Sequence, residues 1–164
     1  MCLYEYVQSD PINVVDPWGL YTEVIQWGRS PGRAGRWGHI SGNINGKNWS
    51  FGPKGWDTNP NASDYAQRQT DPSGIDRGGR GIVLELSPSE EAQLEQCLER
   101  YNNYNTIANN CGNPWIQCLE ELGIIDSTDK SCVLPYDVYR IIVVSPRKSG
   151  TTNYPGSHKP VGTN

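Results

Sequence analysis

Residues 39–52 read His-Ile-Ser-Gly-Asn-Ile-Asn-Gly-Lys-Asn-Trp-Ser-Phe-Gly, and this stretch carries the clearest structural signal in the chain. Asn45-Gly46 lies between two strand-like segments, and such a dipeptide favours a two-residue type I′ turn because both of its residues tolerate a positive φ. That turn would pair Ile44 with Lys47 and Ser41 with Ser50. We therefore predict an antiparallel hairpin in this register.

The two faces of the predicted hairpin differ in polarity, because successive side chains of a strand point to opposite faces. The apolar face, which we expect in the core, carries Ile40, Ile44, Trp49 and Phe51. The opposite face is polar and carries His39, Ser41, Asn43, Asn48 and Ser50. A slip of one residue would exchange the faces. The register therefore predicts that His39 points to the polar face.

A helix is predicted after residue 87. Ser87-Pro88-Ser89-Glu90 has the pattern of a capping box with proline in the first turn. Apolar side chains then recur at helical spacing up to Tyr101. Cys97 lies on this stripe, and we expect it to pack in the core.

The rest of the chain predicts an α+β fold, a small antiparallel sheet packed against two or three helices. Residues 20–27 suit a short strand or helix, and the apolar runs at 81–86 and 139–144 suit strands. Residues 53–80 are rich in Asn, Asp, Gly, Pro and Arg, and we expect a long loop there, either a lid over a site or a disordered segment. Residues 146–164 have the composition of a flexible tail.

Composition excludes several functional classes. The 164 residues carry a net charge of −4, which argues against a nucleic-acid partner. No apolar run is long enough to span a membrane, and the N-terminus lacks the basic and apolar regions of a signal peptide, so we expect export to use another route. With two histidines and no Cys-x-x-Cys pair, we expect neither a metal site nor a cofactor.

Cys111 is the candidate nucleophile. Residues 109–114 read Asn-Asn-Cys-Gly-Asn-Pro, a pattern typical of a helix start. Unpaired N–H groups and the positive end of the helix dipole would favour the thiolate, the nucleophilic form of cysteine. The alternative is that Cys111 is a small buried apolar residue. Cys111 and Cys118, seven positions apart on one helix, would be too far apart for a disulfide.

His39 is the expected partner of Cys111, because the other histidine, His158, lies in the predicted tail. A Cys–His pair needs an imidazole that takes the thiol proton and a third group that orients the ring. Ser50 shares the polar face with His39 and is the candidate third residue, although Ser41, a water or a backbone carbonyl could serve instead. Alternatively, His39 is a hydrogen-bonded structural residue.

The first 20 residues resemble the end of the core domain of Rhs-repeat polymorphic toxins. The resemblance rests on Leu-Tyr-Glu-Tyr-Val at 3–7, Asp-Pro at 10–11 and Asp-Pro-Trp-Gly-Leu at 16–20. It implies a self-cleavage motif, with the cut after its last residue, formed by Asp16, Pro17, Gly19 and Leu20. Residues 1–20 would then end the Rhs core, residues 21–145 would form the toxin domain, and residues 146–164 would be the tail.

Residues 37–125 resemble the permuted papain-like cysteine hydrolases, which include NlpC-type peptidases and the lecithin:retinol acyltransferase type. The resemblance rests on the order of Gly38-His39 on a strand, a second strand at 49–52, and Cys111 before a helix. In that family the second strand often carries another histidine. This chain has none there, which leaves the third catalytic residue open.

Together these resemblances imply an antibacterial effector, the toxin domain of an Rhs protein, acting as a Cys–His thiol hydrolase. Its substrate would be an amide or peptide bond, for instance in peptidoglycan. Lipid acyl hydrolysis, acyl transfer and protein deamidation by the same fold are alternatives. The implied partners are an immunity protein, the Rhs shell and the secretion machinery. Secretion by a contact-dependent or type VI route would deliver the domain to the periplasm or cytoplasm of a target cell.

Two alternatives of a different kind remain open at this point. The chain could be a binding module without catalysis, in which the aromatic hairpin and residues 53–80 recognise a target. It could also be a toxin whose active groups are metal-bound carboxylates, for instance Asp57, Asp64 and Asp71.

Overall fold

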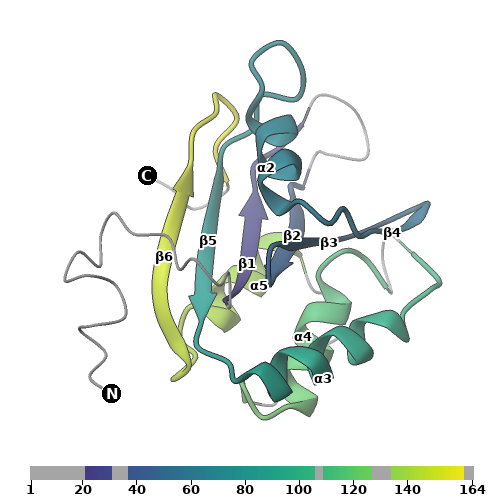
Figure 1. Cartoon of the computed structure of the whole chain (residues 1–164). Helices are drawn as coiled ribbons and strands as arrows, with labels where there is room; N and C mark the ends of the chain where they lie inside the picture. Colours follow the sequence, from purple (N-terminus) through teal and green to yellow (C-terminus); the bar gives the residue numbers. More distant parts are fainter. Residues whose placement is uncertain (1–20, 31–36, 106–108, 127–133, 161–164) are drawn as a thin grey trace.

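A computed structural model of the chain describes residues 21–30, 37–105, 109–126 and 134–160. The Rhs-like motif at Asp16, Pro17, Gly19 and Leu20 lies outside the described residues. Within them, the chain forms one six-stranded antiparallel sheet with helices on both faces (Figure 1). The predicted α+β class with an antiparallel sheet is therefore confirmed, although the sheet is larger than expected.

The sheet has the strand order β4-β3-β2-β1-β5-β6. Its strands are β1 (Thr22–Trp27), β2 (His39–Ile44), β3 (Lys47–Gly52), β4 (Gly55–Asp57), β5 (Gly79–Leu84) and β6 (Lys148–Tyr154). β1 lies in the middle and pairs with β2 on one side and β5 on the other. β1 is thus shielded on both edges, and all of its residues are buried.

The predicted hairpin is confirmed in its register. Ile44 pairs with Lys47 and Ser41 with Ser50, and the turn residues Asn45 and Gly46 have φ values of 52° and 81°. The apolar face is buried, with Ile40, Ile44 and Phe51 fully enclosed. The polar face is also largely buried, because a helix covers it.

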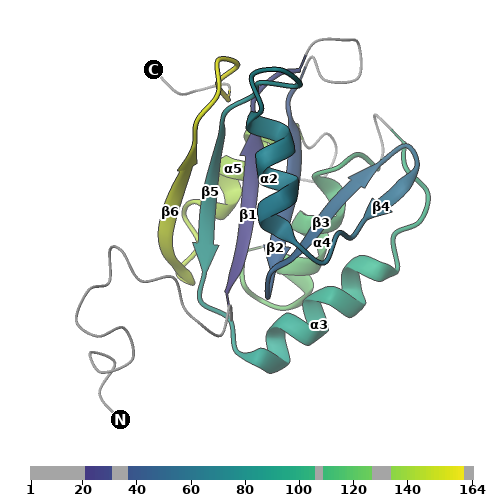
Figure 2. The same cartoon turned by 45° about the horizontal axis from the view of Figure 1, so that its top comes forward.

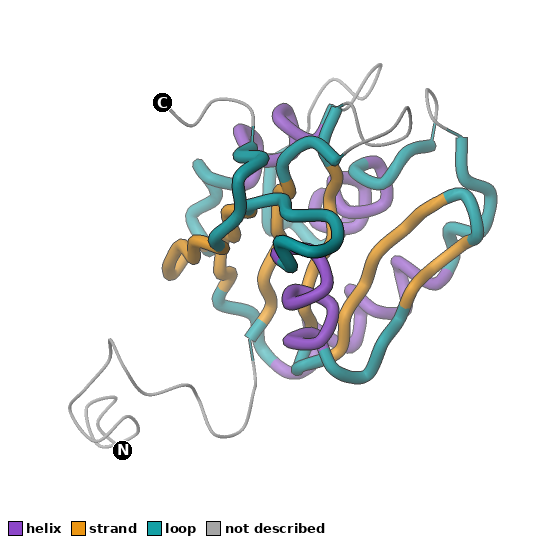
Figure 3. Tube along the Cα trace, turned by 90° about the horizontal axis from the view of Figure 1, so that it is seen from above, coloured by secondary structure: helices purple, strands orange, loops and turns teal. Residues whose placement is uncertain are grey.

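The described residues contain four helices: α2 (Ala62–Thr70), α3 (Pro88–Glu99), α4 (Asn113–Glu121) and α5 (Pro135–Ile142). α2 lies on one side of the strands, and α4 and α5 lie on the other (Figures 1 and 3). α3 runs along the lower end of the sheet, next to α4 (Figure 2). The predicted capping box of α3 is present, and α4 ends before Gly123, whose φ is 66°.

The main core lies between the sheet and the helices α3, α4 and α5. It contains apolar side chains of β1, β2, β3 and β5 together with those of the three helices. Trp115 of α4 packs so closely on β2 that a Cβ at Gly42 would lie 2.2 Å from its ring. Only glycine leaves room for this indole, and α4 is thereby seated directly on the sheet.

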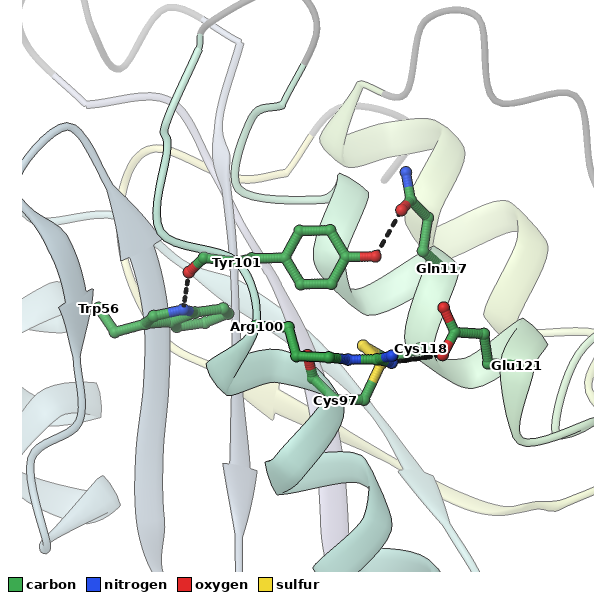
Figure 4. Close-up of a disulfide and its surroundings, with 7 residues drawn as sticks. All are labelled: Trp56, Cys97, Arg100, Tyr101, Gln117, Cys118 and Glu121. Atoms are coloured by element: carbon green, nitrogen blue, oxygen red, sulfur yellow. Dashed lines mark hydrogen bonds and ion pairs between the residues drawn. A yellow bond between two sulfur atoms is a disulfide. The ribbon is translucent and has the colours of Figure 1, made fainter.

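A disulfide joins α3 to α4. Cys97 and Cys118 are bonded, with their Cα atoms 5.7 Å apart, and Arg100 pairs with Glu121 beside them (Figure 4). Cys97 is buried, as predicted, but the prediction missed its partner. Helix spacing excludes a bond between Cys111 and Cys118; which cysteine faces Cys118 depends on how α3 and α4 pack.

Three predicted segments were wrong. Residues 53–80 are not one long loop, because they contain β4 and α2. Tyr139 lies in α5 rather than in a strand, since Pro135 begins a helix in which the Asp137 carboxylate accepts the Leu134 N–H at 3.3 Å. The tail prediction for 146–164 fails at Lys148–Tyr154, which forms the edge strand β6 beside β5. In the described part of the chain, no helix has the length and apolar character needed to cross a membrane.

Candidate active site

Cys111 lies in the turn that leads into α4. Its Sγ accepts a hydrogen bond from the Ile40 backbone N–H at 3.4 Å, across 71 positions of sequence. Ile40 directly follows His39 at the beginning of β2. The packing of α4 on the sheet therefore brings the thiol to the strand end that carries the imidazole.

Asn110 and Asn113 hold the turn around Cys111. The Gly112 N–H donates to Asn110 Oδ1 at 2.9 Å, and the Asn110 N–H donates to Asn113 Oδ1 at 3.0 Å. The Asn113 N–H donates to the Asn110 carbonyl at 3.3 Å. The N–H groups that follow Cys111 are thus engaged within the turn, whereas the N–H of Cys111 itself lies beside its own sulfur.

The His39 ring is held by Ser50, the predicted third residue. His39 Nε2 and Ser50 Oγ are 2.7 Å apart, across the pairing of β2 with β3. This contact leaves Nδ1 as the second ring nitrogen. Nδ1 is the ring nitrogen nearer the main chain of His39, and the N–H of the next residue, Ile40, donates to the Cys111 sulfur.

Ser41, the competing candidate for orienting His39, is engaged elsewhere. Its Oγ accepts a hydrogen bond from Trp27 Nε1 at 2.8 Å. Ser41 lies opposite Ser50 in the sheet, so the two hydroxyls share a face but bind different partners. Ser50 is therefore the hydroxyl that contacts the imidazole.

The structure adds three residues that the sequence analysis missed, and all come from the segment expected to be a loop. Ser50 Oγ lies 3.0 Å from the hydroxyl of Tyr65 on α2. Tyr65 is hydrogen-bonded to Arg77, and Arg77 Nε donates to Gln69 Oε1 at 2.7 Å. A continuous polar network thus runs from His39 through α2 to Arg77.

One local signal could have indicated α2. Asn61 caps the helix, because its side chain accepts from the N–H groups of Ser63 and Asp64. Asparagine before a possible helix is a start signal. Nothing local indicates that Arg77 returns to this helix, because its contacts depend on the path of residues 71–78.

Burial raises the pKa of the Cys111 thiol to about 11, outweighing the Ile40 N–H and the charge of Arg77, which lower it. Burial also lowers the pKa of His39 to about 3, and Arg77 acts in the same direction. Both groups are therefore neutral at rest near pH 7. The predicted resting thiolate is wrong, because α4 begins only at Asn113 and the thiol is 5% exposed.

The carboxylates considered as metal ligands do not come together. No cluster of three His, Cys, Asp or Glu side chains suited to a metal ion occurs among the residues that the structure describes. Asp57 forms an ion pair with Arg68 at 3.5 Å instead. Asp71 accepts hydrogen bonds from Ser73.

Comparisons of the chain with protein-family models, with curated proteins and with solved structures gave no match. The site itself consists of a buried thiol that contacts the Ile40 N–H of β2, one residue after an imidazole that is held by a hydroxyl.

Proposed function

We propose that this domain is a Cys–His thiol hydrolase, with Cys111 as nucleophile, His39 as general base and acid, and Ser50 as the residue that orients the imidazole. The observation that carries the proposal is the meeting at one strand end: the Cys111 sulfur contacts the N–H of Ile40, and the preceding His39 is bound through Nε2. A nucleophile, a base and an orienting group are the elements that acyl transfer requires.

The reaction would start from the neutral pair. As Cys111 Sγ attacks an acyl carbon, its proton passes to His39 Nδ1, and the carbonyl electron pair moves onto oxygen. The Cys111 N–H, which lies beside the sulfur, would donate to that oxyanion. Collapse of this intermediate breaks the bond to the leaving group, which takes the proton from the imidazolium. Water activated by His39 then hydrolyses the thioester.

The order of the elements supports a permuted papain-like fold as part of this proposal. The histidine strand β2 and its partner β3 precede the cysteine and α4. The preferred substrate is an amide, such as a peptide bond of peptidoglycan; lipid esters and protein side-chain amides suit the same chemistry. With the Rhs-like motif at 16–20, the domain would be a secreted antibacterial toxin that is neutralised by an immunity protein.

The disulfide favours the periplasm of the target cell over its cytoplasm. The disulfide between Cys97 and Cys118 lies in the main apolar core. Disulfides persist in oxidising compartments and are rare in the cytosol. Peptidoglycan is also reached from the periplasm, so the compartment and the preferred substrate agree.

The test is a growth-inhibition assay in which the chain is expressed in the cytoplasm or exported to the periplasm. Cys111→Ala and His39→Ala should abolish toxicity, and Cys111→Ser, which preserves the shape, should do so as well. His158→Ala is the matched control, because that side chain is exposed. Full toxicity of the Cys111→Ala variant would refute the hydrolase.

Purified protein gives the chemical readout. Incubation with isolated peptidoglycan should release fragments, and mass spectrometry should detect an acyl group on the Cys111 peptide when the reaction is quenched early. Release of fragments by the Cys111→Ala variant would contradict a thioester intermediate.

A non-catalytic binding module is the second candidate. The burial of the Cys111 thiol and its raised pKa favour it, because buried cysteines are usually inert. Toxicity that survives in both the Cys111→Ala and the His39→Ala variants would support this reading.

A further inference from the structure

Arg77 is a buried cation whose described partners are neutral. It is 7% exposed, its Nε donates to the Gln69 amide, and it is hydrogen-bonded to the Tyr65 phenol. Among the described ion pairs, none includes Arg77. Burial of a charge is costly unless it is paired. A buried guanidinium held by an amide and a phenol therefore suggests that an anion forms nearby.

Cys111 is the acid placed to supply that anion. The titratable groups that interact with the thiol come from different elements: Tyr65 lies on α2, Tyr104 between α3 and α4, and Arg77 before β5. His39 directly precedes Ile40, whose N–H donates to the sulfur. Of these, Arg77 carries the positive charge, because His39 is neutral.

The fold holds Arg77 firmly in this place. The Arg77 N–H donates to the Gln69 carbonyl at 2.9 Å, and the next residue, Gly78, donates to the His158 carbonyl at 3.0 Å. A Cβ at Gly156 would lie 2.4 Å from the Arg77 carbonyl carbon, so the C-terminal segment lies directly against this backbone. The guanidinium therefore does not need to move when charge develops.

We propose that Arg77 is a positioning residue of the thiol hydrolase: a fixed counter-charge that stabilises the Cys111 sulfur when it becomes anionic. This inference rests on the proposed function. Arg77 acts through Cys111 and His39 rather than by touching the substrate. In thiolate–imidazolium pairs the imidazolium is the counter-charge. Here the histidine is neutral at rest, and the arginine is the cation already in place when the thiol gives up its proton.

The sign of the Cys111 pKa shift in the Arg77→Gln variant separates an electrostatic role of Arg77 from a packing role. If Arg77 acts by charge, Arg77→Gln should raise the pKa of both Cys111 and His39, because removal of a cation disfavours the thiolate and favours the imidazolium. If Arg77 only packs the site, its loss should admit water. The Cys111 pKa would then fall while that of His39 rises. The direction for Cys111 distinguishes the two roles.

The measurement is the rate of Cys111 alkylation by iodoacetamide at a fixed pH of about 9, on the whole chain, with NMR titration of His39 alongside. A shift of one unit changes the thiolate fraction about tenfold. The Arg77→Gln variant should therefore react several-fold to roughly tenfold more slowly than wild type. Faster or unchanged alkylation would overturn the proposal.

Two variants serve as controls. Arg80→Gln is matched, since Arg80 Nε also donates to a glutamine, Gln26 Oε1, at 2.8 Å, and it should leave the rate unchanged. Arg77→Lys retains the charge and should stay within about threefold of wild type. If Arg77→Gln does not fold, a tenfold change in the lysine variant overturns the proposal. These readouts need no substrate, so a failed hydrolase assay would be a separate result.

Discussion

The two faces of the sheet bury side chains of different polarity. Against α3, α4 and α5, the buried side chains are almost all apolar, and a disulfide joins two of the helices. Against α2, the sheet buries a set of polar side chains that includes Ser41, Asn43, Asn48 and Ser50. Apolar burial is the larger source of stability, whereas a satisfied polar network specifies positions. The side chains that contribute most to stability and the polar network of the candidate site therefore lie mainly on opposite faces.

Cys111 lies where the two faces meet. Its side chain belongs to the apolar core, yet its sulfur accepts from the N–H of Ile40, which directly follows His39 of the polar face. This location explains both of its properties. The core raises the pKa of the thiol, and in the proposed mechanism the polar network would supply the base and the cation that favour its ionisation.

The largest expected effect is a loss of stability on the apolar face. Leu98 of α3 is fully buried, so Leu98→Ala should lower the free energy of unfolding by about 3 kcal/mol or more, the range for a cavity in a packed core. Urea denaturation followed by tryptophan fluorescence measures it. Ser50→Ala is the polar-face counterpart and should cost about 1 kcal/mol. Equal losses would remove the distinction between the faces.

The disulfide should contribute almost as much. Loss of the link between Cys97 and Cys118, 21 positions apart, should cost about 3 kcal/mol by the entropy of the closed loop. The Cys97→Ser, Cys118→Ser double variant should therefore melt earlier than wild type in oxidising buffer. In excess dithiothreitol the reduced wild type should match it. A double variant as stable as wild type would show that α3 and α4 do not need the link.

On the polar face, the expected effect falls on activity. Ser50→Ala should lower kcat roughly tenfold, less than removal of a general base, because the imidazole is still present but less well oriented. Ser41→Ala is the matched control and should leave kcat nearly unchanged, since Ser41 binds Trp27. Full activity of the double variant would mean that His39 is held by backbone or water instead.

The smallest expected effect is the rate at which the Cys111 thiol is alkylated at neutral pH. With a pKa raised to about 11, Cys111 should be alkylated slowly at pH 7, and its rate should rise about tenfold per pH unit until it approaches that pKa. Peptide mapping by mass spectrometry follows the residue, and the Cys111→Ala variant gives the background. A plateau below pH 8 would mean that the resting thiol is a thiolate after all.

Local sequence determined the features whose causes are local. Asn45-Gly46 favours the turn that sets the register of the hairpin, and that register placed Ser50 on the face of His39. Ser87 and Glu90 formed the predicted capping box. Each of these depends on the steric or hydrogen-bonding properties of a few neighbouring residues, so each could be predicted without the rest of the chain.

The tertiary structure decided what depends on distant partners. Tyr139 lies in a stretch typical of a strand, but the start at Pro135 and the packing of Val138 and Ile142 make it helical. The partner of Cys118 depends on which face α3 presents to α4. Long-range packing overrides a weak local preference in the first case and supplies the missing partner in the second.

The site divides in the same way. Cys111, His39 and Ser50 could be chosen from the sequence because their residue types are suited to acyl transfer. The hairpin and the helix start that carry them could also be predicted from local sequence. Arg77 could not, because its closeness to the thiol depends on the path of the chain after α2. The ionisation of Cys111 and His39 was also beyond the sequence, since a pKa depends on how much water the folded surroundings exclude and which charges they bring near.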